Sequence, residues 1–338
     1  MLVIKNNKLK VLHRYEPIVI LGQGSFARDL EEILINHGFY VKDLITSKDL
    51  APYPNKKAQL LIGIFNRETP FSKLVKEAEL AGFETIFLPW EYYERFQTDL
   101  GWRYWLTYPE YIFENITKIN DVETLLSDEH SKQLLTNIVQ FRTGQNIDYS
   151  QYQDTEPQYF NYLTLANTVK CYIDGGAYTG DSYWDLCKLT KVDQTFLFEP
   201  DPENFKKLSK TIHDAVCLPL ALADQISLVS FNFNKGESGA ITTLGLPNVL
   251  AVSIDDLFRH KQVDLIKLDL EGGEIAALNG AKEVLANSRP RLAVSLYHKP
   301  DDLWNIPLLL KALCPGYKFY IRQHYYNSFD CVLYGIPE

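Results

Sequence analysis

The sequence lacks long apolar runs, which excludes the usual signatures of membrane-spanning and exported proteins. Its longest apolar stretches, such as residues 60–65, have the length of a β-strand, whereas crossing a bilayer takes roughly 20 apolar residues. The N-terminus, M-L-V-I-K-N-N-K-L-K, contains no signal-peptide core. We therefore expect a cytoplasmic protein with no transmembrane segment.

Paired cysteines, clustered metal ligands and a basic surface are also missing. The 5 cysteines are odd in number and have no C-x-x-C spacing, which favours free thiols in a reducing compartment. The 7 histidines have no H-x-x-x-H or H-E-x-x-H spacing, so we expect no metal site from them. The formal net charge of −9, without a lysine-arginine stripe, argues against nucleic acid as a partner.

What the sequence does contain begins with a strand, a turn and a helix. Residues 17–21 form a continuous apolar run, which is typical of a parallel strand buried on both faces. A glycine turn, G-Q-G-S-F-A from Gly22 to Ala27, and a helix with one apolar face follow. Further strands are expected at 40–46, 59–65 and 84–88, and a helix at 72–81. This pattern predicts a small Rossmann-like α/β domain over residues 1–95.

The G-x-G-x-x-A spacing of this turn makes an NAD(P)-dependent oxidoreductase one alternative function. Such an enzyme needs an acid at the tip of the second strand to bind the ribose. Here that strand ends in Thr46 and Ser47, and Asp43 lies inside it. We therefore expect Gly22 and Gly24 to serve the tight turn itself or a small ligand.

Residues 96–160 are poor in glycine and show helical periodicity, so we expect a helical connector. Aromatic residues are concentrated between residues 92 and 113, a pattern more typical of core packing than of a ligand platform. A helix is expected to open at S-D-E-H, residues 127–130. Two roles are open for this connector: it covers the mouth of the downstream site, or it holds two subunits together. A homo-oligomer is therefore one arrangement that the sequence allows.

A second glycine turn, C-Y-I-D-G-G-A-Y-T-G-D, begins the C-terminal half. A strand ends there at Asp174, and the glycines let the backbone approach a ligand closely. The next strand ends in E-P-D-P, with Glu199 at its tip, where an acid can accept both ribose hydroxyls of a nucleoside. Asp201 suits the N-cap of the following helix. Two strand-tip acids in succession indicate a nucleoside-binding site.

The alternation of strands and helices continues to the C-terminus. The motif D-L-I-K-L-D places Asp269 at the tip of a further parallel strand, ahead of L-E-G-G-E, and the fifth strand ends near His298. Strands are expected at 215–220, 227–233, 249–254, 264–269 and 291–297, and the last two, 317–323 and 330–334, are expected to form an antiparallel pair.

These motifs, in this order, resemble class I S-adenosylmethionine-dependent methyltransferases and, more closely, the FkbM family. The matching motifs are I-D-G-G-A-Y-T-G-D, F-E-P-D-P-E-N-F, A-L-A-D, V-S-I-D-D-L and I-K-L-D-L-E-G-G-E. The resemblance spans residues 170–334 and does not cover residues 1–95. It implies an α/β fold for residues 161–338, with a mostly parallel seven-stranded sheet, an antiparallel last strand and extra β segments.

The resemblance also implies an enzyme with S-adenosyl-L-methionine as its cofactor. Members of the family methylate hydroxyl groups, so the resemblance implies that the acceptor is a sugar or another small or carrier-bound metabolite, such as a saccharide intermediate of glycan assembly. A non-catalytic nucleoside-binding or scaffold protein that kept the fold is a further alternative, against which the intact strand-tip acids count.

Carried over to this chain, the family motifs imply a cofactor site in four parts. The residues are Asp174, Gly175, Gly176, Thr179 and Gly180 around the methionine part, Glu199 at the ribose with Pro200 and Asp201 beside the adenosine, Leu222 or Ala223 at the adenine, and Asp269 and Glu271 on the substrate side.

A hydroxyl acceptor needs a base with a pKa near neutral. His298 is the first candidate, Asp269 the second and His324 the third, although His298 could instead hydrogen-bond its own loop. Many family members carry a glutamate late in the fifth strand, where this chain has S-L-Y-H, which leaves the base open. A divalent metal bound by Asp269, Glu271 and Glu274 is an alternative, but no further ligand has diagnostic spacing, so we expect none.

Overall fold

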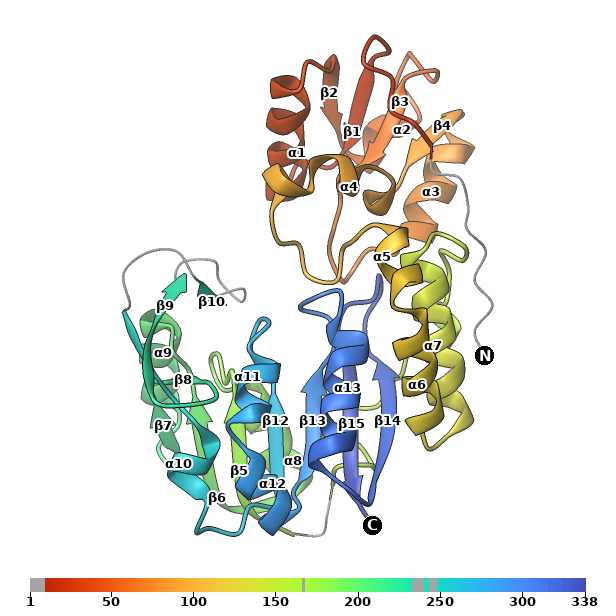
Figure 1. The fold of residues 1–338 in the computed structure, drawn as a ribbon. Coiled ribbons are helices and arrows are strands. Elements are labelled where there is room, and N and C mark those ends of the chain that lie inside the picture. The colour runs from red at the N-terminus through yellow and green to blue at the C-terminus, as the bar shows by residue number, and fades with distance from the viewer. Residues whose placement is uncertain (1–9, 166–167, 233–239, 243–247) are drawn as a thin grey trace. The chain divides into compact units, whose positions relative to one another are not determined.

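The computed structural model describes residues 10–165, 168–232, 240–242 and 248–338 (Figure 1). The chain folds as two compact units, each assembled from separate segments. Unit 1 comprises Met1–Asn120, Lys132–Gln153 and Tyr325–Asp330. Unit 2 comprises Asp121–Ser131, Asp154–His324 and Cys331–Glu338. The expected division at residues 95 and 160 stays a prediction.

Unit 1 is built on a four-stranded parallel sheet with the order β2-β1-β3-β4. All four residues of β1 are buried, as its continuous apolar run predicts. The expected β-α-β pattern is therefore present, with elements shifted by a few residues. The elements are β1 (Ile18–Leu21), α1 (Ser25–Asn36), β2 (Val41–Ile45), α2 (Ser47–Leu50), β3 (Gln59–Ile62), α3 (Phe71–Leu80), β4 (Thr85–Phe87) and α4 (Pro89–Leu100).

The first glycine turn brings two backbone segments of this unit together. Gly22 has φ +145°, and a Cβ there would lie 2.8 Å from the carbonyl oxygen of Gly63. The second strand tip carries Thr46, whose backbone N–H and hydroxyl both donate to Asp49 at the start of α2. Asp43, inside β2, accepts a hydrogen bond from Tyr53. The turn thus has a packing role that needs no dinucleotide.

The segment between the two expected α/β domains is helical, as predicted. Its aromatic residues pack in unit 1, where Trp90 and Trp105 have exposed fractions of 1% and 0% and both rings contact Phe141. The elements are α5 (Pro109–Glu114), α6 (Ile116–Leu125), α7 (Glu129–Arg142) and the 3-10 turn η1 (Ser150–Tyr152).

Unit 2 contains a seven-stranded sheet with the order β14-β15-β13-β12-β5-β6-β7. The strand β15 is antiparallel to both of its neighbours, and the other pairs are parallel, which confirms the fold expected from the sequence. The strands are β5 (Thr168–Gly175), β6 (Lys191–Phe198), β7 (Val216–Leu218), β12 (Leu265–Leu268), β13 (Arg291–Ser295), β14 (Tyr317–Gln323) and β15 (Cys331–Pro337).

Among the described residues, the six helices α8 to α13 accompany this sheet, and α11, α12 and α13 lie in front of it in Figure 1. The helices are α8 (Asp181–Leu189), α9 (Pro202–Thr211), α10 (Ile254–Phe258), α11 (Glu274–Asn279), α12 (Lys282–Ser288) and α13 (Asp302–Leu313). The extra β segments form a second sheet, with the order β10-β9-β11-β8 among the described residues. Its strands are β8 (Ala221–Leu222), β9 (Ser227–Asn232), β10 (Ala240–Thr242) and β11 (Val249–Val252); residue 233 of the expected strand lies outside the described residues.

Two elements of unit 2 differ from the expectation for physical reasons. The strand β6 begins at Lys191, whereas the apolar run in the sequence predicts a strand only at 194–198, because the residues before Thr195 pair with β5 without being buried. The helix α13 is not among the elements expected from the sequence, and Pro307 lies inside it. Its buried side chains, which include Trp304 and Leu310, hold it against the unit despite the missing hydrogen-bond donor.

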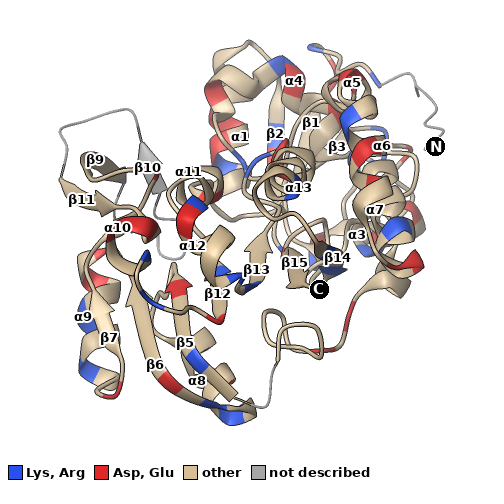
Figure 2. Cartoon of the chain, turned by 60° about the horizontal axis from the view of Figure 1, so that its bottom comes forward, with Lys and Arg blue, Asp and Glu red and all other residues tan. Residues whose placement is uncertain are grey.

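Charge and hydropathy agree with the composition. In the view of Figure 2, blue Lys and Arg residues are interspersed with red Asp and Glu residues. The described residues show no continuous basic stripe in this view. No helix in the described ranges is long and apolar enough to cross a membrane.

Candidate active site

The candidate site lies where four neighbouring strands of unit 2 end. The strands β6, β5, β12 and β13 are adjacent and parallel, so their carboxyl ends meet at one edge of the sheet. This edge carries Asp174, Glu199, Asp269 and His298, in or just after the four strands. Ligands bind at this edge in open α/β sheets, beside the point where strand order reverses.

The glycine turn after β5 has a backbone that only glycine accommodates. Gly176 has φ +76°, and a Cβ there would lie 1.9 Å from the backbone oxygen of Asp269. Gly180 has φ +94°, and its Cβ would lie 2.4 Å from the Cδ1 atom of Ile212. The backbone N–H groups of Gly176 and Ala177 both donate to the carbonyl of Phe198, which fixes the turn to the end of β6.

Asp174 is fully buried at the end of β5, directly before the glycine turn. Its Oδ1 atom lies 3.0 Å from Nζ of Lys267 on β12, and Oδ2 accepts a hydrogen bond from the Ser182 hydroxyl. The same ammonium donates to the carbonyl of Gly176 at 2.7 Å. Burial works against the charge of Lys267, but the neighbouring Asp174 and Asp269 outweigh it and raise the pKa of that lysine. The carboxylate of Asp174 thus has protein partners, and its contact with a cofactor stays a prediction.

Glu199 is buried at the tip of β6 with one backbone donor on each carboxylate oxygen. Oε1 accepts from the N–H of Asp201, and Oε2 accepts from the N–H of Tyr178, each at 2.8 Å. Burial raises the pKa of Glu199 to about 7, although these two donors oppose the shift. These two hydrogen bonds fix the side chain in place, and each carboxylate oxygen can still accept a further hydrogen bond.

The remaining predicted cofactor residues have mixed positions. Asp201 caps α9, and its Oδ1 atom accepts from the N–H groups of Glu203 and Asn204, as expected. Leu222 approaches the turn, because a Cβ on Gly175 would lie 2.9 Å from its Cδ1 atom. Ala223 is buried next to Leu222, while Pro200 and Thr179 are half-buried near the strand tips.

Asp269, after β12, is the focus of several side-chain hydroxyls. Its Oδ1 atom accepts from Ser295 at 2.7 Å, and Oδ2 accepts from Tyr159 at 2.8 Å. Tyr297 also approaches Oδ1, at 3.4 Å. Burial favours the neutral acid, but His298, Lys267 and these donors outweigh it and lower the pKa of Asp269.

His298 follows β13 and has an exposed fraction of 0%. Its Nδ1 atom lies 2.8 Å from Oε1 of Glu274, and Nε2 lies 3.2 Å from Oδ1 of Asp269 and 3.7 Å from Oε1 of Glu271. Burial lowers the pKa of His298, but the three carboxylates outweigh it and raise that pKa well above its ordinary value. The ring is thus buried between carboxylates that hold its proton, which does not favour His298 as the base, and its role as the base stays a prediction.

The other two candidate residues differ in position. Glu271 lies in the turn after β12 with φ +51°, a conformation costly for a non-glycine residue, and it brings its carboxylate near His298.

His324, the third candidate for the base, follows β14, and β15 lies between β14 and β13 in the sheet. Its Nε2 atom lies 2.9 Å from the hydroxyl of Tyr334, and burial lowers the pKa of this histidine to about 4. This position does not favour His324 as the base.

Three residues of this site were not expected from the sequence: Lys267, Tyr159 and Ser295. A lysine inside the otherwise apolar strand L-I-K-L is the one signal that sequence reasoning could have used, because a buried lysine needs a partner. Tyr159 and Ser295 reach Asp269 from distant parts of the chain, so no local pattern marks them.

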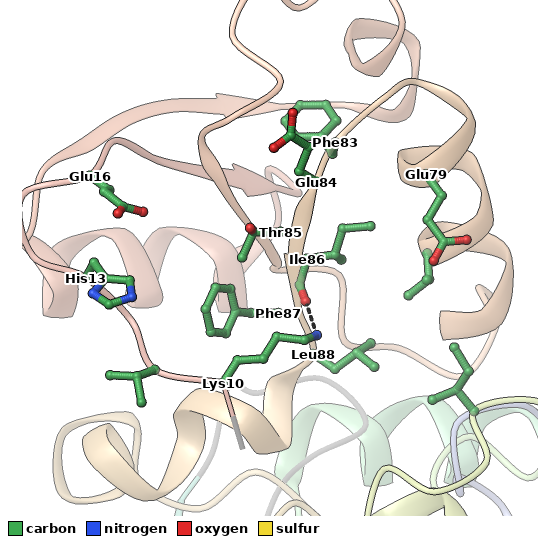
Figure 3. Close-up of a pocket in the computed structure, with 13 residues that line it drawn as sticks. Lys10, His13, Glu16, Glu79, Phe83, Glu84, Thr85, Ile86, Phe87 and Leu88 are labelled. Carbon is green, nitrogen blue, oxygen red and sulfur yellow. Dashed lines mark hydrogen bonds between the residues drawn. The ribbon is translucent and has the colours of Figure 1, made fainter. Parts of the chain in front are cut away.

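A groove of about 720 Å³ is also present in unit 1, beside the edge strand β4 (Figure 3). Lys10 extends into it and donates to the carbonyl of Ile86 at 2.5 Å. None of the residues predicted for the site line this groove. The candidate site is therefore the strand-tip edge of unit 2.

The comparisons with known proteins agree with this geometry. Residues 174–322 match the sequence profile of the Methyltransferase FkbM domain. The fold is similar to that of a methyltransferase FkbM from Methylobacillus flagellatus KT, with a TM-score of 0.73 and 20% identity over 94% of this chain and 89% of that chain. Among curated proteins, none matches the chain.

Two further solved structures are more distant. A complex of the Haloferax volcanii Trm112 methyltransferase activator with a putative methyltransferase has a TM-score of 0.31 and 11% identity, over 52% of this chain and 86% of that chain. A TehB-like SAM-dependent methyltransferase from Corynebacterium glutamicum has a TM-score of 0.29 and 10% identity, over 68% of this chain and 100% of that chain. These scores are too low to carry an argument. The profile match, joined to the strand order and the strand-tip site, identifies residues 174–322 as an FkbM methyltransferase domain and the chain as a methyltransferase.

Proposed function

We propose that the chain is an S-adenosyl-L-methionine-dependent O-methyltransferase that acts on a hydroxyl of a sugar or another small or carrier-bound metabolite. The observation that carries this proposal is the fixed carboxylate of Glu199 beside the glycine turn of β5. Both of its oxygens are held by backbone donors at 2.8 Å. The acceptor class comes from the family resemblance.

The residues at the strand tips fit an adenosyl ligand. An ionised carboxylate offers about four acceptor positions, and the backbone occupies one on each oxygen of Glu199. The remaining positions suit the two ribose hydroxyls of a nucleoside. Leu222, packed against Gly175, gives the neighbouring surface an apolar character that suits an adenine ring.

S-adenosyl-L-methionine, when bound, supplies a methyl group on a positively charged sulfur. The chain's own part is to hold the acceptor hydroxyl in line with that methyl group, since alignment supplies much of the rate of such a displacement. Asp269 is the residue we propose for this role. Its side chain is 24% exposed, whereas that of His298 is fully buried. Tyr159 and Ser295 keep its two oxygens in fixed positions.

The alternative of an NAD(P)-dependent oxidoreductase has less support. The acid nearest to the tip of β2, Asp49, already accepts two hydrogen bonds from Thr46. Asp43 points its carboxylate to Tyr53. Neither acid is placed as a ribose ligand.

A calorimetric titration tests the proposal. S-adenosyl-L-methionine should bind the wild-type protein, and Glu199→Gln should weaken binding at least about tenfold, because hydrogen bonds to a charged group contribute about 1.5–3 kcal/mol. Glu203→Gln is the matched control, because Glu203 is an exposed acid in the first turn of α9 and should leave the affinity unchanged. Binding of NADH without binding of S-adenosyl-L-methionine would favour the oxidoreductase. Cofactor binding without transfer to any hydroxyl in a broad acceptor screen would favour a nucleoside-binding or scaffold protein.

A further inference from the structure

Three metal-ligating side chains converge at the acceptor side of the site. Asp269 follows β12, Glu274 begins α11 and His298 follows β13. Each offers one ligand atom, and these atoms all lie within 4.8 Å of one another. A divalent cation with bonds of about 2.0–2.6 Å to oxygen or nitrogen fits between ligands at such separations.

The charges around His298 do not balance. Three carboxylates face the ring, from Glu274 at Nδ1 and from Asp269 and Glu271 at Nε2. A proton on the ring and the ammonium of Lys267, which Asp269 shares with Asp174, still leave an excess of negative charge. Glu274 and His298 are both fully buried, and a buried charge is costly unless it is paired.

An independent observation comes from the second oxygen of Glu274. Oε1 accepts the backbone N–H of Leu270 at 2.6 Å and lies 2.8 Å from Nδ1 of His298. Oε2 is buried and has no hydrogen-bond partner. Oε2 is the second oxygen of the carboxylate that contacts the imidazole. A buried carboxylate oxygen without a hydrogen-bond donor is available as a ligand for a cation.

The cluster is held in position and has an opening. Ser295 and Tyr159 orient Asp269, as outer partners orient metal ligands in proteins. Glu274 and His298 close the inner side, while the side chains of Asp269 and Glu271 are 24% and 15% exposed. A cation can therefore enter, and a hydroxyl can reach it, from the Asp269 side.

We propose that Asp269, Glu274 and His298 bind a divalent cation of the Mn²⁺ or Mg²⁺ class, with coordination positions open to the acceptor hydroxyl. Carboxylate oxygens with one imidazole nitrogen suit Mn²⁺, which accepts both. The inference deepens the proposed methyltransferase function, on which its role rests. A bound cation would orient the acceptor oxygen and make its hydroxyl more acidic.

Titration of the chelator-treated full chain with Mn²⁺ alone tests the proposal, with electron paramagnetic resonance reporting the free ion. We expect one saturable site per chain. Asp269→Asn, at a partly exposed position, should weaken Mn²⁺ binding at least about tenfold, and Glu274→Gln should do the same where the variant folds. The matched control is Asp264→Asn, because Asp264 precedes the same strand at its other end and binds the N–H groups of Lys170 and Cys171.

The outcomes separate this inference from the proposed function. The absence of saturable Mn²⁺ binding would overturn the metal site. An equal loss in Asp264→Asn and Asp269→Asn would overturn it too, since that pattern means unspecific attraction to surface acids. Binding of S-adenosyl-L-methionine is measured separately in the same preparation, so either ligand can fail without the other.

Discussion

The Nζ atom of Lys267 lies 3.0 Å from Oδ1 of Asp174, and both side chains are almost completely buried. The same ammonium bonds the carbonyl of Gly176 and lies 5.1 Å from the ring of Tyr159, whose hydroxyl reaches Asp269. One lysine therefore connects the glycine turn of β5 with the acid after β12. The cofactor side and the acceptor side of the candidate site share this support.

We expect Lys267→Met to destabilise the protein by about 3–5 kcal/mol, because it leaves the buried Asp174 carboxylate without its partner. Chemical denaturation in urea measures this loss. The double variant with Asp174→Asn should recover part of the stability, since no uncompensated charge then remains. A loss below about 0.5 kcal/mol in the single variant would show that the pair contributes little.

Gly176→Ala should lower the free energy of unfolding by more than about 2 kcal/mol, because the left-handed conformation alone costs a non-glycine residue about 1–2 kcal/mol. The added Cβ also meets the backbone oxygen of Asp269 at 1.9 Å, which no side-chain movement can relieve. Thermal denaturation measures the effect. Gly24→Ala is the control, because Gly24 has φ −74° and no atom within 4 Å of an added Cβ. Equal effects of the two substitutions would contradict the packing described for the turn.

Glu199 should make the stability of the ligand-free protein depend on pH. Burial raises its pKa to about 7 in the folded chain, above the ordinary value of 4.5, so the folded state keeps a proton that the unfolded state has lost between these values. This contribution is present at low pH and is lost as the pH rises through 7. Between pH 5 and 8, wild type should lose about 2–3 kcal/mol relative to Glu199→Gln. Parallel stability curves for the two proteins would argue against the raised pKa.

Substitutions of Asp201 can distinguish its role as the N-cap of α9 from a contact with the cofactor. Asp201→Ala should cost about 1 kcal/mol of stability, because the N–H groups of Glu203 and Asn204 lose their acceptor. Asp201→Asn should preserve the cap and most of the stability. If Asp201→Asn nevertheless weakens S-adenosyl-L-methionine binding in calorimetry, its charge serves the adenosine as well as the helix.

The sequence predicts the site residues that lie at the carboxyl ends of strands. The apolar runs and the residues that interrupt them place Asp174, Glu199 and Asp269 at successive tips, and the sheet brings these tips to one edge. The seven-stranded order and the antiparallel β15 agree with the family resemblance. The N-cap at Asp201 is also readable, because capping is a local interaction.

The contacts of those side chains were not predictable from local pattern. The choice of His298 as base depends on exposure, and Glu274 at the start of α11 and Asp269 after β12 enclose its ring. Tyr159 reaches Asp269 from a segment 110 residues earlier in the chain. Such partners are set by the packing of distant segments and have no periodicity of their own.

The interleaving of the two units along the chain limits where this enzyme can be divided. Arg322 of unit 2 is almost fully buried, and it bonds Asp128 at 2.6 Å and lies 3.4 Å from Asp154. Both acids precede the methyltransferase motifs, and unit 1 in turn takes residues 325–330 from between β14 and β15. A fragment that begins at residue 161 would therefore bury a guanidinium without either carboxylate. Excision, fusion or exchange of the catalytic half has no single cut point that leaves both units whole.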